Sequence, residues 1–412
     1  MKPRRGTGAG RGPDAGASDG ADGWLAGSGE AGDVVLSSRA RLARNIAGFR
    51  FPNRASPAER TAMVGRLKPV VLSAGFAPQV EWVDLSSTSS MHRGALVEEH
   101  LISRQHAMGK PGESMHGRAV AIGLPERRLS VMINEEDHLR LQVMRSGLDL
   151  AAALEEIDAL DDRIEARVDY AFDPRFGYLT ACPTNIGTGA RLSVMLHLPA
   201  LRMTREIEKV KRAADDLGLT VRGAHGEGSE ASGDFYQLSN QTTIGKSEAV
   251  LLKELEAEIV PSVIAYERTA RQRLVKGGRR GLEDQAWRAV GVLLHARLLA
   301  ADEAMQLLSR LRLGIAVGIV PQVSMALVNR LIIACQPSHL QLAVAQELTQ
   351  EQRREARAAL LRARLGAAFA AGPPMPRRGL IRPGDEPPAS DPPASEPDQA
   401  GDPDAPGPAG SG

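Results

Sequence analysis

The amino-acid sequence predicts an α+β domain followed by a smaller domain built from helices. Residues 33 to about 256 mix short runs of alternating apolar and polar residues with helical stretches and turn residues. Beyond residue 256 the apolar residues recur with helical periodicity, and strand signals become rare. Both ends of the chain contain too few apolar residues to assemble a core.

The first 32 residues are rich in Gly, Ala and Asp, so we expect residues 1–32 to be a disordered N-terminal extension. The first 20 residues carry charge but no apolar run of the kind found in secretory signals. We therefore expect a protein that is not secreted.

The first domain is expected to span residues 33–256. Short alternating runs predict five strands: "VVLSSRARLA" (34–43), "LSVMIN" (129–134), "LRLQVM" (139–144), "YLTACP" (178–183) and "LTVRGAHG" (219–226). Two stretches between them predict helices: "ARLSVMLHLPAL" (190–201) and "TREIEKVKRAADDLG" (204–218).

The second domain is expected to span residues 257–370. Its apolar residues follow helical spacing in three stretches: "IAYERTARQRLVKG" (264–277), 282–314 and "TQEQRREARAALLRARLG" (349–366). The remaining residues, 371–412, are mostly Pro, Gly, Ser and acidic residues, which predicts a disordered tail.

Composition narrows the class of protein. The 51 basic and 50 acidic residues nearly cancel, which argues against a protein that binds nucleic acid directly. Two cysteines, Cys182 and Cys335, are too few for a disulfide framework and indicate a reducing cytoplasm. No apolar run approaches the roughly 18 residues that cross a membrane. The nine histidines show no metal-site spacing, so we predict no metal held by protein side chains.

One stretch, "VMINEEDHLRLQ" (131–142), places three carboxylates together after an apolar run. In an extended chain Glu136 and Arg140 project from one face, and Leu139 and Leu141 project from the other. A plain surface ion pair would explain Glu136 and Arg140 if this stretch stood alone. Carboxylates crowded in this way favour a cationic partner.

Three other stretches supply arginines. Arg39 and Arg41 lie two residues apart, so both project from one face of the predicted strand. Arg191 lies near the start of the predicted helix at 190–201, where free backbone N–H groups favour anions. Arg222 precedes a Gly-rich loop that contains Glu227 and Glu230. Together these residues predict a site for a polyphosphate and a cation.

Two common phosphate motifs do not explain the pattern. "IGKS" (244–247) resembles the end of a P-loop, but Asn240 stands where that motif requires Gly. "GEGSEA" (226–231) matches the glycine spacing of a dinucleotide fingerprint. However, Glu227 and Glu230 would then face the negatively charged pyrophosphate, which argues against that function.

In combination the motifs resemble the phosphagen (guanidino) kinase family, and within it the bacterial protein-arginine kinase branch. The resemblance covers about residues 33–360 and implies an antiparallel sheet flanked by helices, followed by a helical domain. Relatives that act on free creatine or arginine carry a small helical domain before the catalytic one. Here a Gly-rich stretch precedes "VVLSSRAR", which favours the protein-modifying branch. The motifs are "SSRARLARN", "NEEDHLRLQ", "CPTNIGTGARLSVM" and "RGAHGEGSEASGDFYQLSNQ".

The resemblance implies that ATP binds with Mg²⁺. Five arginines would hold its phosphates: Arg39, Arg41, Arg140, Arg191 and Arg222. Neighbouring residues would line the nucleotide pocket: Ser37, Ser38, Ala40, Leu192, Ser193, Val194, Met195, Gly223, Ala224, His225, Gly226 and Glu227. His100 resembles the family's histidine beside the nucleotide, although a surface histidine on a helix explains it equally well.

For the acceptor, the resemblance assigns an arginine guanidinium held by a pair of carboxylates. A guanidinium stays protonated below a pH of about 12, so a base must remove a proton as the N–P bond forms. We assign Glu136 and Glu227 to this pair, with Glu230 in reserve. Cys182 matches the family's reactive cysteine near the guanidinium, whereas Cys335 is expected in the core.

The helical domain contains a candidate phosphoarginine sensor. Protein-arginine kinases often carry an Arg-Asp-x-x-Arg-Ala motif that binds phosphoarginine. This chain has Arg353 and Arg357 at the outer positions, but Arg354 replaces the Asp. Either the two outer arginines still hold a phosphate, or the stretch is a solvated helix face.

The leading hypothesis is a kinase that transfers the γ-phosphoryl group of ATP to arginine residues of proteins. The alternatives are a kinase for free arginine or another small guanidino compound, and a non-catalytic adaptor that binds phosphoarginine. The resemblance also implies a Clp-type unfoldase and protease and a small zinc-binding activator as partners, and it allows a homo-oligomer.

Overall fold

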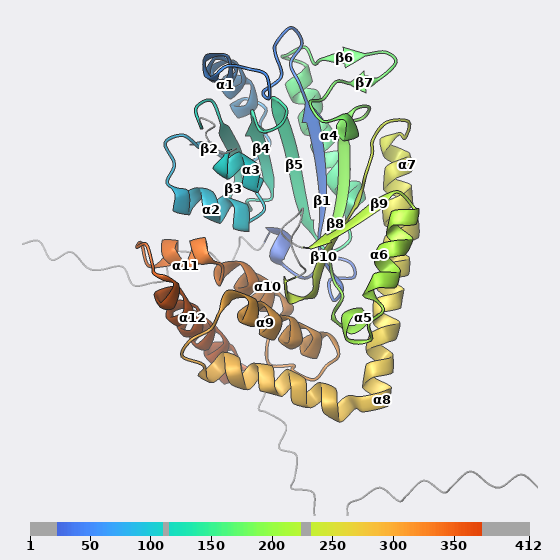
Figure 1. The fold of residues 1–412 in the computed structure, drawn as a ribbon, viewed down its shortest axis with the longest axis vertical. Helices are drawn as coiled ribbons and strands as arrows, with labels where there is room; N and C mark the ends of the chain where they lie inside the picture. The colour runs from blue at the N-terminus through green and yellow to red at the C-terminus, as the bar shows by residue number, and fades with distance from the viewer. Residues whose placement is uncertain (1–22, 110–114, 224–231, 373–412) are drawn as a thin grey trace, which may run out of the picture. The chain divides into compact units, whose positions relative to one another are not determined.

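The computed structural model describes residues 23–109, 115–223 and 232–372. These described residues belong to one compact unit, and everything below concerns them. A central antiparallel sheet carries helices on its faces, and a helical region follows in the chain (Figure 1). This arrangement confirms the predicted α+β class.

The main sheet has eight strands in the order β2-β3-β4-β5-β1-β8-β10-β9, and every neighbouring pair is antiparallel. A separate hairpin pairs β6 with β7. The strands are β1 Val35–Arg44, β2 Gln79–Asp84, β3 Ala119–Leu124, β4 Leu129–Ile133, β5 Leu139–Ser146, β6 Phe172–Asp173, β7 Gly177–Tyr178, β8 Ala190–His197, β9 Leu219–Gly223 and β10 Phe235–Asn240.

The α-helices are α1 Pro57–Leu72, α2 Ser90–Glu98, α3 Arg104–Met108, α4 Leu150–Glu165, α5 Pro199–Met203, α6 Ile207–Asp216, α7 Glu248–Leu252, α8 Val260–His295, α9 Ala301–Ala316, α10 Met325–Ala334, α11 Pro337–Ala343 and α12 Gln350–Ala371. Short 3-10 turns occur at η1 Gly23–Leu25, η2 Pro183–Asn185 and η3 Ser232–Asp234, and a π-helical turn, η4, spans Lys253–Ile259.

The two faces of the central strands differ because side chains alternate along each strand. Ala40 and Leu42 of β1 are buried with Leu141 of β5 in the core that includes α4. Arg39 and Arg41 project from the other face of the same strand. Each fully buried leucine contributes roughly 1.5–3 kcal/mol, so the apolar residues determine which face carries the arginines.

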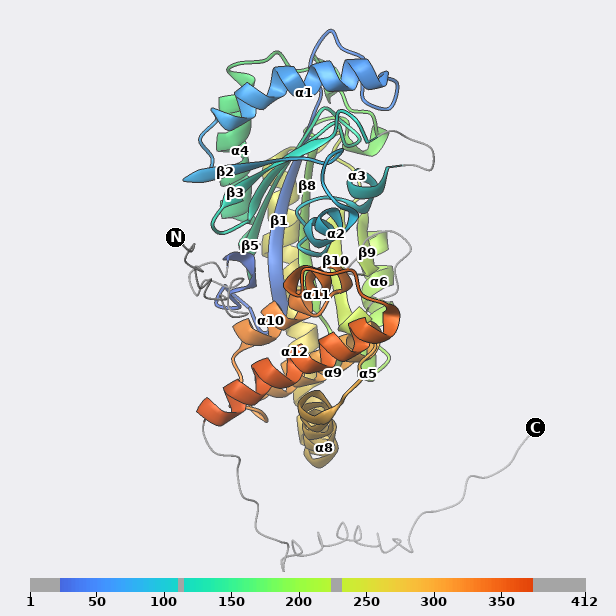
Figure 2. The ribbon, with the colours of Figure 1, turned by 90° about the vertical axis from the view of Figure 1, so that its left-hand side faces the viewer.

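Helix α8 connects the sheet to the helical region. Its first half contributes Val260 and Ile264 to the core beneath the sheet, and its second half contributes Leu282 and Leu293 to a second core with α9 and α12. The helix is interrupted at Gly278. Figure 1 shows that its two halves run in different directions, and in Figure 2 the second half is seen end-on. The domain boundary that we predicted after residue 256 therefore falls within a continuous helical run, without a linker.

Three local predictions were wrong. The stretch 190–201 is strand β8 followed by the short helix α5, because β8 pairs with β1 on one side and β10 on the other. "YLTACP" contributes only Tyr178 to a strand; residues 179–182 are irregular, and Pro183 begins the turn η2. Residues 134–138 form bends rather than extended chain, so the strand begins at Leu139.

The predicted N-terminal extension was also wrong for residues 23–32. Trp24 is buried, and the backbone N–H of Gly27 donates to Ser146 Oγ at 3.0 Å. Arg312 of α9 donates to the carbonyl of Gly32 at 2.7 Å. A single tryptophan and several long-range hydrogen bonds order a stretch whose composition alone suggests disorder.

Candidate active site

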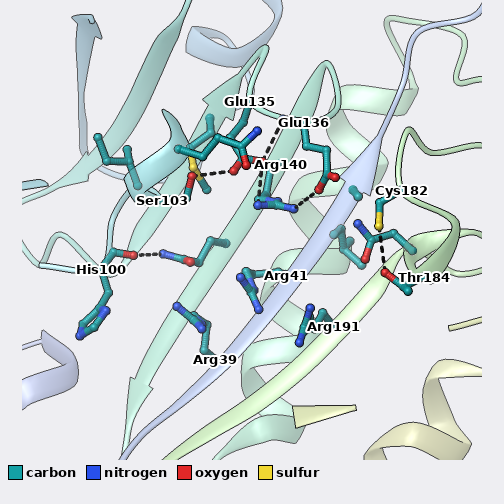
Figure 3. A pocket seen from close by; sticks show the side chains of 18 of the residues that line it. Arg39, Arg41, His100, Ser103, Glu135, Glu136, Arg140, Cys182, Thr184 and Arg191 are labelled. Atoms are coloured by element: carbon teal, nitrogen blue, oxygen red, sulfur yellow. Dashed lines mark hydrogen bonds and ion pairs between the residues drawn. The ribbon is translucent and has the colours of Figure 1, made fainter. Parts of the chain in front are cut away.

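A cavity of about 860 Å³ lies on the arginine-bearing side of the sheet. Its wall includes side chains from β1, β5, β8 and β9, from α2 and α3, and from the connection that precedes β8. Figure 3 shows its side chains converging from these separate elements. Residues more than 150 positions apart in the sequence thus share one space.

All five predicted phosphate-binding arginines line this cavity. Strand register brings them together: Arg41 of β1 is the partner of Arg191 of β8, and Arg140 of β5 is the partner of Ala43 of β1. Arg39 lies two residues before Arg41 on the same face, and Arg222 lies on β9. The grouping that the sequence suggested is therefore present in space.

Arg39 and Arg41 are buried among other arginines of the cavity. Burial, together with the nearby Arg191 and Arg140, lowers the pKa of Arg39 to about 10. Burial and the neighbouring arginines also lower the pKa of Arg41 well below its usual value, and its buried Nε has no hydrogen-bond partner among the described residues. A buried donor without an acceptor is costly, so this group of cations favours an anionic ligand.

Arg39 is oriented by uncharged partners. Its Nη2 donates to Gln237 Oε1 at 2.8 Å, and its Nε lies 3.3 Å from Ser193 Oγ. Neutral acceptors fix the direction of the guanidinium without cancelling its charge. Arg39 thus keeps its capacity to attract an anion.

Glu135 and Arg140 form a buried ion pair beside the cavity. Arg140 Nη1 lies 2.7 Å from Glu135 Oε2, and Ser103 donates to Glu135 Oε1 at 2.6 Å. Burial opposes the charge on Glu135, but Arg140, His106 and the hydrogen bonds that Glu135 accepts together outweigh burial and keep the pKa of Glu135 below its usual value. Glu135 therefore holds Arg140 in place.

Glu136 is the carboxylate that faces the cavity. Its Oε2 lies 3.2 Å from Arg140 Nη2, and its side chain remains about one-third exposed. Burial raises the pKa of Glu136, with further contributions from Glu135 and Asp137 that oppose the effect of Arg140. A carboxylate with a raised pKa accepts protons more readily than an ordinary glutamate.

Asp137 is not among the residues that line the cavity, and it joins two loops. Its Oδ1 accepts from Asn45 Nδ2 at 2.6 Å and from the backbone N–H of Ala181 at 2.7 Å. The carboxylate thereby fixes the chain immediately before Cys182. Asp137 is a structural residue.

Cys182 lines the cavity, and its Sγ lies 3.0 Å from Thr184 Oγ1. The following Gly187–Gly189 turn packs closely: a Cβ at Gly189 would lie 2.7 Å from the carbonyl oxygen of Ala43, and the φ of Gly189 is +68°. The Arg44 guanidinium contacts this turn through the carbonyl of Thr188 and forms an ion pair with Asp161 of α4 at 2.6 Å. These contacts set the position of Cys182 and of the start of β8.

The structure does not bring every predicted nucleotide residue to the main cavity. Ala40, Leu192 and Val194 are buried in the core on the opposite face of the sheet, and Ser38 donates to the carbonyl of Gly147 at 2.8 Å. Because strand side chains alternate, residues between the arginines point away from them. Gly223 is buried at the end of β9, where it pairs with Tyr236.

The other predicted residues lie elsewhere. Ser37, Ser193 and Met195 line a small adjacent cavity with Arg39 and His100. His100 lines both cavities, so it is not simply a surface histidine. The predicted residues Ala224, His225, Gly226, Glu227 and Glu230 lie outside the described residues.

The candidate sensor residues are engaged in structural contacts. Arg357 is 2% exposed, and it donates to the carbonyls of Cys335 at 2.8 Å and Leu299 at 2.9 Å. Burial lowers its pKa. Arg353 donates to the carbonyl of Leu348 at 2.7 Å. The expectation that both arginines present their guanidinium groups to a phosphate is wrong for Arg357, because backbone carbonyls occupy it.

Several cavity residues were not predicted. Gln237 and Ser103 orient Arg39 and Glu135 respectively, and Thr184 contacts Cys182. Gln237 lies within a motif that carried the resemblance, and that motif was the available signal. Ser103 had no such signal, because its contact depends on how α3 packs against the sheet.

Two negative findings apply to the described part of the chain. No group of three or more His, Cys, Asp or Glu side chains there is arranged to hold a metal ion. Within the same residues, every helix is too short or too polar to cross a membrane.

Comparisons with known proteins agree with this geometry. Residues 66–270 match the model of the ATP:guanido phosphotransferase C-terminal catalytic domain, and residues 279–373 match that of the protein-arginine kinase McsB C-terminal domain. The division between the two matches falls inside α8, near its change of direction at Gly278.

Two similar proteins match over nearly their whole lengths. The protein-arginine kinase of Symbiobacterium thermophilum is 45% identical over 347 residues, which cover 84% of this chain and 96% of that protein. The protein-arginine kinase of Halalkalibacterium halodurans is 46% identical over 343 residues, which cover 83% of this chain and 94% of that protein.

Among solved structures, the duplicated taurocyamine kinase from Schistosoma mansoni with bound transition state analog components is similar. It is 26% identical with a TM-score of 0.52, and the match covers 63% of this chain and 37% of that one.

Proposed function

Because the chain belongs to the protein-arginine kinases of the ATP:guanido phosphotransferase family, we propose that it transfers the γ-phosphoryl group of ATP to arginine side chains of proteins. The observation that carries this proposal is the cavity itself. Five arginines meet in it from four strands of the sheet, and the carboxylate of Glu136 lies beside them.

In this proposal the arginine cluster binds the triphosphate. Phosphoryl transfer requires little covalent assistance and much neutralisation of charge, and guanidinium groups bind phosphate oxygens in a forked geometry. The Nε of Arg41 supports this role, because it is a buried donor that has no hydrogen-bond partner within the described part of the chain and that a phosphate oxygen would satisfy.

The acceptor would lie beside Glu136. The Nη atom of the substrate arginine attacks the γ-phosphorus, the bond from that phosphorus to the β-phosphate oxygen breaks, and ADP leaves. The guanidinium gives up one proton in this step, and a carboxylate takes it. We assign this role to Glu136, which lines the cavity, while Glu227, with Glu230 as the reserve, is assigned by family resemblance as the second carboxylate.

Cys182 is proposed as a neighbour of the acceptor guanidinium rather than as a nucleophile. It lines the same cavity as Glu136, and its hydrogen-bond contact with Thr184 fixes the position of the sulfur. No covalent intermediate on Cys182 is needed, because the phosphoryl group passes directly to nitrogen.

Mg²⁺ enters this proposal as part of the substrate MgATP. The described side chains do not themselves form a metal site. Mg²⁺ commonly binds through nucleotide phosphates and water with few protein ligands, which fits a cavity whose polar wall is mainly cationic. No step here is assigned to the ion.

The wider role follows the same family resemblance. We propose that the modified proteins are passed to a Clp-type unfoldase and protease and that a small zinc-binding protein activates the kinase. Both cysteines are free thiols, which agrees with our assignment to the reducing cytoplasm.

A direct test is incubation with γ-labelled ATP and Mg²⁺ in the presence of an unfolded protein or of free arginine. We expect acid-labile label on arginine residues of the protein, identified by mass spectrometry, and loss of that label with Glu136→Gln. Label on free arginine alone would reject the proposal in favour of a kinase for small guanidino compounds. Full cellular function of the Glu136→Gln variant would instead favour a binding adaptor.

A further inference from the structure

The residues before β1 contact the candidate active site. Trp24 lies in the turn η1, and this turn packs against β1, β5 and α10. The backbone of this segment is held from both sides: the N–H of Leu148 donates to the carbonyl of Glu30 at 2.8 Å, and Asn329 of α10 donates to the carbonyl of Leu25 at 3.2 Å. The segment is therefore built into the fold at one end of the central strands β1 and β5.

The indole of Trp24 meets the imidazole of His100. Their ring centroids are 5.8 Å apart, and the planes are inclined at 70°, an edge-to-face arrangement. Such pairs are directional, because the positive edge of one ring faces the negative face of the other. Trp24 is only 5% exposed, so its own position is fixed by packing.

The backbone of His100 is fixed separately from its ring. Gln142 of β5 donates to the His100 carbonyl at 2.7 Å, and the N–H of His100 donates to the carbonyl of Val97. His100 has a φ of +60°, which is uncommon for a residue other than glycine. With the backbone held in this way, the contact with Trp24 constrains the remaining freedom of the side chain, the rotation of its ring.

His100 occupies a distinct end of the cavity. Figure 3 shows it on the far side of Arg39 and Arg41 from Glu136 and Cys182. It lines the main cavity and also the small one that contains Ser37, Met144 and Met195. If the phosphates bind the arginines and the acceptor lies by Glu136, His100 lies toward the nucleoside end of ATP.

We propose that Trp24 is a positioning residue that orients His100 for contact with the nucleotide. This inference rests on the proposed kinase function, since it requires ATP in the cavity. Trp24 lies outside both segments that match the family models, 66–270 and 279–373, so neither match assigns it a role. It acts through His100 and does not itself line either cavity.

The kinetic test compares Trp24→Leu and Trp24→Phe with Trp287→Leu. Trp287 is a matched control because it also forms an aromatic pair, with Phe369 at 6.3 Å, but lines neither cavity. We expect Trp24→Leu to raise the KM for ATP by about 3- to 10-fold with a smaller change in kcat, since an aromatic pair contributes a factor of that size. Trp24→Phe should recover part of the loss, and Trp287→Leu should leave the KM for ATP unchanged.

A second measurement remains informative if Trp24→Leu folds poorly. In the full chain carrying Trp82→Phe and Trp287→Phe, Trp24 is the only tryptophan, because the sequence contains three. Titration with ATP and Mg²⁺ should change its fluorescence, and adding His100→Ala should remove that change while some nucleotide binding remains. If Trp24 had only a packing role, its fluorescence response to ATP would not depend on His100.

These experiments distinguish a failure of the positioning role of Trp24 from a failure of the proposed kinase function. ATP binding with no change in Trp24 fluorescence, or equal KM values for Trp24→Leu and Trp287→Leu, would overturn the positioning role and leave the kinase proposal intact. Absence of any ATP binding to the folded wild-type chain would overturn both.

Discussion

Arg41 of β1 and Arg191 of β8 are cross-strand partners, so two guanidinium side chains leave the same face of the sheet directly opposite each other. Like charges in this arrangement destabilise a sheet. The burial that lowers the pKa of Arg41 adds to this cost. A cluster of this kind is expected where an anionic ligand supplies the compensating charge.

Replacing Arg41 should therefore have opposite effects on stability and binding. We expect Arg41→Met to raise the free energy of unfolding of the ligand-free protein by about 0.5–1 kcal/mol. The same change should weaken ATP binding by about 10- to 100-fold, since a charge-assisted hydrogen bond is lost. Urea unfolding and nucleotide titration measure the two effects. Arg54→Met is the control, because Arg54 is exposed and does not line the cavity; equal effects of the two substitutions would contradict the prediction.

Inorganic tripolyphosphate should stabilise the protein without nucleoside or acceptor. At about 100 times its Kd, a ligand that binds only the folded state adds about 2.7 kcal/mol. The rise in melting temperature should shrink in Arg41→Met and at high salt, which screens charge. A melting temperature that does not respond to tripolyphosphate would mean that the cluster does not bind polyphosphate.

Glu136 should control proton transfer more than nucleotide binding. We expect Glu136→Gln to lower kcat by about 10²- to 10⁴-fold, the range for loss of a general base, with little change in the Kd for ATP. Because burial raises the pKa of Glu136, the rate should fall as pH drops through that raised pKa. Rapid-mix kinetics over a pH series test this, with the exposed Glu347→Gln as the control. A Glu136→Gln enzyme with normal kcat would remove Glu136 from the reaction.

His339 of α11 should make stability depend on pH. Burial opposes its charge, but hydrogen bonds to Glu98 and Glu99 of the α2 C-terminus outweigh this and raise its pKa to about 9. The pKa is raised on folding, so the stabilisation is complete below the unfolded value of 6.5 and is lost as pH rises through about 9. His339→Gln should remove roughly 2 kcal/mol at neutral pH and flatten this dependence. Unfolding between pH 6 and 10 measures it, and the exposed His92→Gln should keep the wild-type profile.

Arg357 should contribute to stability rather than to sensing. We expect Arg357→Met to lower the free energy of unfolding by about 2–4 kcal/mol, because it leaves the buried carbonyls of Cys335 and Leu299 without their donor. Thermal unfolding measures the loss, and Arg354→Met provides a neighbouring control. Unchanged stability with lost binding of free phosphoarginine would restore the sensor interpretation.

Much of the site could be predicted from sequence because strand geometry is periodic. Arg39 and Arg41 alternate with Ala40 and Leu42, so an extended chain had to place both arginines on one face. The same alternation shows why Ala40 was a poor candidate for the cavity. The three adjacent carboxylates predicted a cationic partner, and the family resemblance then singled out Glu136 among them.

Other features depended on contacts between distant segments. Residues 190–201 are amphipathic enough to form either a helix or a strand, and hydrogen bonding to β1 and β10 on both sides made them a strand. Composition suggested disorder around Trp24, yet its burial and the contacts of Arg312 with this segment order it. Arg357 could have been solvent-facing on α12, and only the packing of α12 placed it against two backbone carbonyls.

The sequence by itself determined which side chains are available and which of them share a face within one strand, since that depends only on the local period of two. Tertiary structure alone decided that Arg41 lies opposite Arg191 and that Trp24 meets His100. Register between strands, and packing between segments far apart in the chain, arise from many weak contacts made together, and no short stretch of sequence encodes them.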